Sequence, residues 1–197
     1  MVGIGTAEGL TDEGLTTFGL TAESAIVVVA DIVTVEETPE ATTVEQEFPK
    51  ATGEAQAAPD GFPAIGVTIA DDETGTPTLA IPDGDAPADL QVATLIKGTG
   101  AVVGTAADVL VNYQGSIWGT KAIFDDSWAR GAATNFNTSQ VVTGFAKAIE
   151  GQTVGSQVLV TIPPSEGYGE TGNSGAGITG TDTLVFIIDI LGAADSE

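Results

Sequence analysis

From about Leu90 onward, short apolar stretches alternate with turns rich in glycine and aspartate. Segments 90–101, 107–117 and 157–162 carry Val, Leu, Ile or Tyr between such turns, and this pattern predicts β-strands. Segment 183–191, TLVFIIDIL, is an almost continuous apolar run, which indicates a strand buried on both faces. The second half of the chain is therefore expected to be rich in strands.

One segment breaks the strand pattern. In TGFAKAIEG (143–151), Phe145 and Ile149 stand at helical spacing and Gly151 follows as a stop signal, which predicts one short helix. A glycine-rich loop, GETGNSGAGITGTD (169–182), separates the last two strands. Four or five antiparallel strands with one helix and one long loop make an α+β domain, which we assign to residues 87–193.

The residues before this domain show weaker patterns. Residues 39–62 are rich in Glu, Thr, Ala and Pro without an apolar period, and we interpret them as an acidic linker. Residues 63–86 contain two short β-like stretches around the turn cluster DDETGT. This segment is expected to form a hairpin or an extended arm that lies on the next domain.

The two ends of the chain resemble each other. Residues 1–38 align with residues 159–196 without a gap, so that GLTAESAIVVVADIV matches GITGTDTLVFIIDIL. We interpret residues 1–38 as the C-terminal remnant of a degenerate repeat of the same domain, with Leu10 at the position of Tyr168. Because an apolar strand without partners exchanges readily, the remnant is expected to be poorly ordered or paired with a neighbouring chain or with the hairpin.

Composition excludes several classes of function. The chain has 5 Lys and Arg against 28 Asp and Glu, a net charge of −23, which disfavours nucleic acid as a partner. It has no Cys and no His, so disulfides, thiolate chemistry and Ser-His or Cys-His pairs are absent, and neither a zinc site nor a cofactor is expected. No apolar run approaches the roughly 20 residues of a transmembrane helix.

Several motifs follow one another in a specific order: VNYQG (111–115), IFDDSWARG (123–131), NFNTSQVVTGFAKAIEGQTVGSQVLVTIPPSEGYG (135–169) and TLVFIIDIL (183–191). In this order and spacing they resemble the FKBP-type peptidyl-prolyl cis-trans isomerases. The resemblance implies an FKBP-like bent antiparallel sheet wrapped around one short α-helix, here with an N-terminal β-rich extension. It also implies rotation of X-Pro imide bonds in peptides and proteins by desolvation in an apolar groove, with folding-chaperone character.

Carried over residue by residue, the resemblance implies ten residues around this groove. The catalytic set that it implies is Tyr113, Phe124, Asp125, Tyr168 and Phe186. The substrate-binding set that it implies is Phe136, Val141, Val142, Phe145 and Ile178.

The resemblance also implies individual roles. Phe145 would be the floor of the groove, where many members have Trp, while the Tyr168 hydroxyl and the Val142 N–H would bind substrate carbonyls. Asp125 would close one side, near Tyr113 and Arg130. Asn173 departs from the His of some members, and its loop lacks the usual prolines, so the rate and inhibitor affinity follow less directly than the fold.

Other interpretations stay open from the residues alone. The phenylalanines would be core residues in almost any β-rich domain, and the fold could serve as a peptide or protein binding module without significant turnover. Trp118 and Trp128 lie in polar stretches, where they mark either a binding surface or ordinary packing. The expected partners are proline-containing peptides or proteins and macrolide inhibitors, and analogy favours an extracytoplasmic or envelope location over a cytoplasmic one.

Overall fold

The computed structural model describes residues 44–194. The segment that we interpret as a repeat remnant, residues 1–38, lies outside the described residues. The elements in chain order are β1 (Glu54–Ala55), β2 (Gly66–Ile69), β3 (Pro77–Ala80), β4 (Gln91–Lys97), β5 (Asp108–Ile117), β6 (Ile123–Asp126), α2 (Ser127–Arg130), β7 (Thr134–Asn137), η1 (Thr138–Gln140), α3 (Thr143–Ile149), β8 (Gln157–Ile162), η2 (Pro164–Glu166), η3 (Gly169–Thr171), η4 (Ser174–Ala176) and β9 (Leu184–Ala194).

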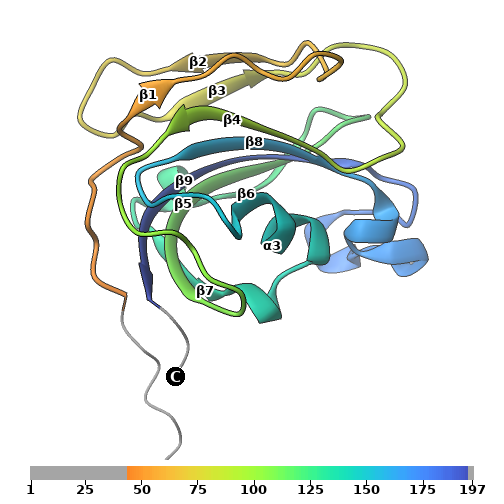
Figure 1. The fold of residues 1–197 in the computed structure, drawn as a ribbon. Helices are drawn as coiled ribbons and strands as arrows, with labels where there is room; N and C mark the ends of the chain where they lie inside the picture. Colours follow the sequence, from red (N-terminus) through yellow and green to blue (C-terminus); the bar gives the residue numbers. More distant parts are fainter. Residues whose placement is uncertain (1–43, 195–197) are drawn as a thin grey trace, which may run out of the picture. The chain divides into compact units, whose positions relative to one another are not determined.

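The main sheet of the described residues has seven strands in the order β1-β4-β8-β9-β5-β6, with β7 also paired to β5. Every pairing in it is antiparallel. Its main helix, α3, lies on one face of the sheet, inside its curve (Figure 1). The predicted α+β fold, an antiparallel sheet around one short helix, is confirmed.

Strand β9 is buried on both faces, as its apolar run predicts. On the inner face Phe186, Ile188 and Ile190 belong to one core cluster together with Phe145 of α3. On the outer face, Val185 and Ile187 form a second cluster with Leu159 and Trp118. Alternate side chains of a strand point to opposite faces, so one strand serves both clusters.

The outer cluster is covered by residues 62–88, which we call the arm. Its strands β2 and β3 pair as an antiparallel hairpin, from Gly66 opposite Ala80 to Ile69 opposite Pro77. Figure 1 shows this hairpin on the face of the sheet opposite α3. The arm packs on the outer cluster through apolar side chains, namely Phe62, Ile65, Val67, Leu79, Ile81 and Ala86. Burying them removes apolar surface of both layers from water, which holds the arm on the sheet.

Part of the segment interpreted as a linker also packs on the domain. Val44 is buried with Leu110 and Leu191, and the Phe48 N–H donates to the Leu191 carbonyl at 3.1 Å. Farther along, β1 pairs with β4 at the sheet edge. The far end of β9 is apolar on its outer side, so an extended chain laid across it gains both burial and backbone hydrogen bonds.

A buried carboxylate marks this contact. Asp189 of β9 is only 1% exposed and accepts hydrogen bonds from the Ala51 N–H at 2.9 Å and the Gln157 amide at 2.8 Å. Burial raises the pKa of Asp189, while these two donors act in the opposite direction. The donors explain how a charged side chain is tolerated inside the fold.

Trp118 belongs to the packing between arm and sheet. It is 4% exposed, and its indole N–H donates to the Gly84 carbonyl at 3.0 Å. The Lys121 ammonium lies 5.3 Å from the centre of the Trp118 ring and also donates to the Pro82 carbonyl. Of the two interpretations left open for Trp118, the structure supports packing, and Trp128 lies partly buried against the same cluster.

Candidate functional site

Five aromatic rings from five different elements meet on the inner face of the sheet. Tyr113 of β5 lies 5.5 Å from Phe136 of β7 and 6.1 Å from Phe145 of α3, measured between ring centres. Phe186 of β9 lies 5.3 Å from Phe145 and 5.5 Å from Phe124 of β6, in both cases edge to face. Edge-to-face rings attract each other beyond their burial, so these contacts fix the ring positions. We call this set the aromatic cluster.

Together with its neighbours, the aromatic cluster forms a site with a buried floor and a partly exposed rim. Tyr113, Phe145, Phe186 and Ile178 are each at most 5% exposed. The rim residues are partly buried and pack against the same core, namely Phe124, Phe136, Val141, Val142 and Tyr168. The structure therefore brings the nine apolar or aromatic residues of the predicted site together in the inner core.

The tenth predicted residue, Asp125, joins the cluster through a polar triad. The Tyr113 hydroxyl donates to Asp125 Oδ2 at 2.5 Å, and Arg130 donates to Asp125 Oδ1 and, at 3.1 Å, to the Tyr113 hydroxyl. The Arg130 guanidinium also lies 5.5 Å from the Tyr113 ring centre, in cation–π range. The triad thus holds the Asp125 carboxylate at the edge of the apolar floor, beside a positive charge.

This triad has a consequence at alkaline pH. Burial raises the pKa of Tyr113 to about 12, and the hydrogen bond to Asp125 adds to the rise. An unfolded tyrosine titrates near pH 10, at about its unperturbed pKa. The folded chain therefore holds a proton that the unfolded chain releases, so this contribution to stability is complete below about pH 10 and is lost as the pH rises through about 12.

Urea unfolding between pH 9 and about pH 12 should show this loss. We expect the free energy of unfolding of the wild type to fall more steeply across this range than that of Tyr113→Phe, which has no phenol to titrate. Equal slopes for the two proteins would contradict the assignment of the raised pKa to Tyr113.

Two polar groups at the rim have no partner within the described residues. No hydrogen bond among them uses the Tyr168 hydroxyl or the backbone N–H of Val142, the residue that precedes α3. The Val142 carbonyl, in contrast, accepts from the Phe145 N–H at 2.9 Å to begin the helix. One donor and one hydroxyl thus remain available beside an apolar surface.

Gly115 of β5 allows two rings of the cluster to meet over the strand. A methyl group at this position would lie 2.6 Å from Phe124 Cζ and 2.7 Å from Phe186 Cε1, closer than such atoms approach in proteins. The absence of a side chain at Gly115 is therefore required for the edge-to-face contact between Phe124 and Phe186.

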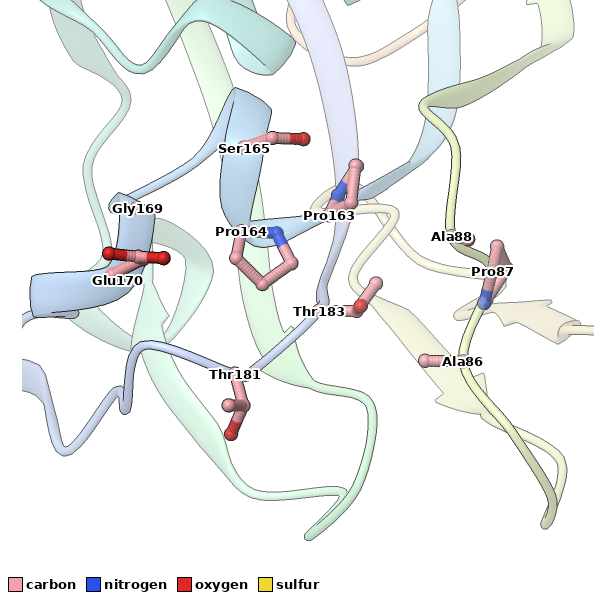
Figure 2. A pocket seen from close by; sticks show the side chains of 10 residues that line it. All are labelled: Ala86, Pro87, Ala88, Pro163, Pro164, Ser165, Gly169, Glu170, Thr181 and Thr183. Atoms are coloured by element: carbon pink, nitrogen blue, oxygen red, sulfur yellow. The ribbon is translucent and has the colours of Figure 1, made fainter.

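A separate hollow of about 510 Å³ lies between the arm and the loops on either side of Tyr168. Figure 2 shows Pro87 and its neighbours from the arm on one side and Pro163, Pro164 and Glu170 on the other. This hollow is not predictable from the sequence, because its arm wall comes from a segment whose place on the domain no motif specifies. Within residues 44–194, no three His, Cys, Asp or Glu side chains are grouped to hold a metal ion.

Known proteins resemble this chain in sequence and in fold. A family model described as FKBP-type peptidyl-prolyl cis-trans isomerase matches residues 101–191. The chain is 39% identical over 117 residues to a probable FK506-binding protein of Corynebacterium glutamicum, a match that covers 59% of this chain and 98% of that protein. It is 33% identical over 117 residues to the FK506-binding protein of Streptomyces anulatus, covering 58% of this chain and 94% of that protein.

A solved structure supports the same assignment. The crystal structure of FkpA from Escherichia coli superposes with a TM-score of 0.51 at 28% identity, covering 55% of this chain and 49% of that chain. No helix among residues 44–194 is both long and apolar enough to cross a bilayer. The motif order, the aromatic cluster on the concave face of the sheet and a relative matched over almost its whole length lead to one conclusion: the chain belongs to the FKBP-type peptidyl-prolyl cis-trans isomerases.

Proposed function

We propose that X-Pro isomerisation takes place on the aromatic cluster, with the prolyl ring seated on Phe145 and Phe186. The observation that carries this proposal is the convergence of five rings beside two unpartnered polar groups, the Tyr168 hydroxyl and the Val142 N–H. An apolar floor with a few placed hydrogen-bonding groups is the usual form of a small ligand site.

The chemistry needs no acid, base or nucleophile. An X-Pro bond rotates over a barrier of about 18–20 kcal/mol, because the planar amide loses its resonance on twisting. The twisted form is less charge-separated than the planar form, so an apolar surface with little water favours it. Only contacts that strengthen in the twisted form accelerate the reaction. A chain without His or Cys is sufficient for such a mechanism.

The roles within the cluster follow from position. The Val142 N–H and the Tyr168 hydroxyl would hold the carbonyls that flank the proline in a turned geometry, while Phe124, Phe136, Val141 and Ile178 exclude water. Asp125 accepts hydrogen bonds from Tyr113 and Arg130, so it would close one side of the site without moving. Its carboxylate would act by position rather than by proton transfer.

Two relatives are named for binding FK506. We propose that such a macrolide would occupy the same aromatic cluster, in competition with prolyl peptides. The natural substrates proposed here are proline-containing peptides and proteins, with assistance to protein folding as a further role of the same site.

Isomerisation of a short prolyl peptide tests these roles. Phe124→Ala is expected to lower kcat/KM about tenfold, because it opens the apolar wall to water, and Tyr168→Phe about fivefold through loss of one hydrogen bond, or about 1 kcal/mol. Phe62→Ala, which removes a partly buried ring on the opposite face of the sheet, is the matched control and should stay close to the wild type. Wild-type rates in both site variants, or turnover absent from the wild type, would contradict the proposal.

A further inference from the structure

We propose that the hollow between the arm and the loops around Tyr168 is a second substrate subsite, which binds an extended, basic segment of the chain whose proline is being isomerised. The inference rests on the proposed function, since it needs the proline to lie at the aromatic cluster. It adds a preference for prolines that have lysine or arginine a few residues away.

The hollow lies within reach of such a segment. Glu170 on its wall follows Tyr168 by two residues, so their Cα atoms are at most about 7.6 Å apart. An extended peptide advances about 3.3 Å per residue. A substrate residue two to four positions from the proline would then lie at the hollow when Tyr168 contacts the flanking carbonyl.

The arm wall of the hollow suits an extended peptide. Ala86, Pro87 and Ala88 lie outside any helix or strand, and no hydrogen bond among the described residues uses the backbone groups of Ala86 or Ala88. Free backbone donors and acceptors are what an added peptide pairs with when it lies along a chain segment. Across the hollow, the partly exposed Pro164 offers apolar surface for the aliphatic part of a long side chain, with the buried Pro163 behind it (Figure 2).

The charge around the hollow is negative. Glu170 on the wall is exposed, and so are Asp85 and Asp89, which flank the Ala86–Ala88 stretch on both sides. Neither ion pair of the described residues involves them, and no lysine or arginine lines the hollow. A cationic side chain would thus meet the Glu170 carboxylate on the wall, with Asp85 and Asp89 next in sequence to the arm wall, while its methylene groups cover Pro164. This complementarity selects a basic segment over an acidic one.

The test compares two prolyl peptides that differ only in having lysine or alanine at the third and fourth positions from the proline, on both sides. At low ionic strength the wild type should turn over the lysine peptide with a kcat/KM about fivefold higher, mainly through KM, because exposed ion pairs contribute modestly and are screened by salt. In Glu170→Gln combined with Asp89→Asn, the ratio between the two peptides should fall to near one.

A double variant with the same change in net charge is the control. Glu54→Gln combined with Asp60→Asn neutralises two exposed carboxylates that neither line the hollow nor adjoin a residue that does, and it should keep the wild-type ratio. A ratio that persists in the Glu170 and Asp89 variant, or that falls equally in the control, would overturn the subsite. Absence of turnover of both peptides by the wild type would instead contradict the proposed function.

A binding measurement further separates failure of the subsite from failure of the proposed function. On addition of the lysine peptide, the amide NMR signals of Ala86, Ala88 and Thr181 should shift, whereas the alanine peptide should leave them nearly in place. Equal shifts with both peptides, or none, would overturn the subsite even if isomerisation were normal.

Discussion

Replacing Gly115 with alanine is expected to lower kcat/KM for a prolyl peptide about ten- to hundredfold, which corresponds to about 1.4 to 2.7 kcal/mol. The new methyl group would overlap Phe124 and Phe186, so at least one ring must leave its place. The proline would then lose either its apolar wall or part of its floor. The same overpacking should lower the free energy of unfolding by about 1–3 kcal/mol, which urea titration measures.

Gly119→Ala is the matched control for this substitution. It adds one methyl group to the turn between β5 and β6, where no atom lies within 4 Å of the new carbon, and its rate and stability should stay near those of the wild type. If Gly115→Ala were as active as Gly119→Ala, the contact between Phe124 and Phe186 would have no part in catalysis.

Trp118→Ala is expected to give the largest loss of stability, about 3–5 kcal/mol in urea unfolding, as is typical of a large buried ring cut to alanine. The ring joins the arm to the outer face of the sheet, and its removal leaves the Gly84 carbonyl without its donor and takes the cation–π contact from Lys121, which keeps its hydrogen bond to Pro82. The turn that Trp118 anchors leads directly into β6, so the position of Phe124 should loosen as well and isomerase activity should fall.

Two further variants help to separate the causes of this loss of stability. Trp118→Phe keeps the apolar packing but not the N–H donor, so it should cost less, about 1–2 kcal/mol. Val102→Ala, at a side chain that is 62% exposed, should be almost neutral. A loss below about 1 kcal/mol in Trp118→Ala would show that the arm contributes little to the stability of the domain.

Much of the candidate site follows from the order of the motifs. Tyr113, Phe124, Phe145 and Phe186 are far apart in the chain, and periodicity alone gives no reason for them to meet. Their joint spacing carries this information, and the structure brings them together. The apolar run of β9 also predicts a strand covered on both faces, and the structure supplies the arm as the second cover.

Other features could not be predicted from the sequence, for physical reasons. Trp118 stands among glycine, threonine and lysine, and whether such a ring is exposed depends on a layer contributed by residues more than thirty positions earlier. The hydrogen bonds of Asp189 depend in the same way on Ala51. The pattern of hydrophobic and polar residues in a segment indicates whether the segment tends to be buried. Which other segment buries it depends on tertiary packing.

The two sides of the main sheet carry separate apolar clusters that share strands but no side chains. Release of the arm would therefore open the outer layer while the rings on the inner face keep their mutual contacts, so the domain has a route to partial opening below its global unfolding. In that opened form Leu159, Val185 and Ile187 would be exposed to water as an apolar patch, which favours self-association. The packing of the arm on the sheet therefore affects the tendency of the protein to aggregate as well as its stability.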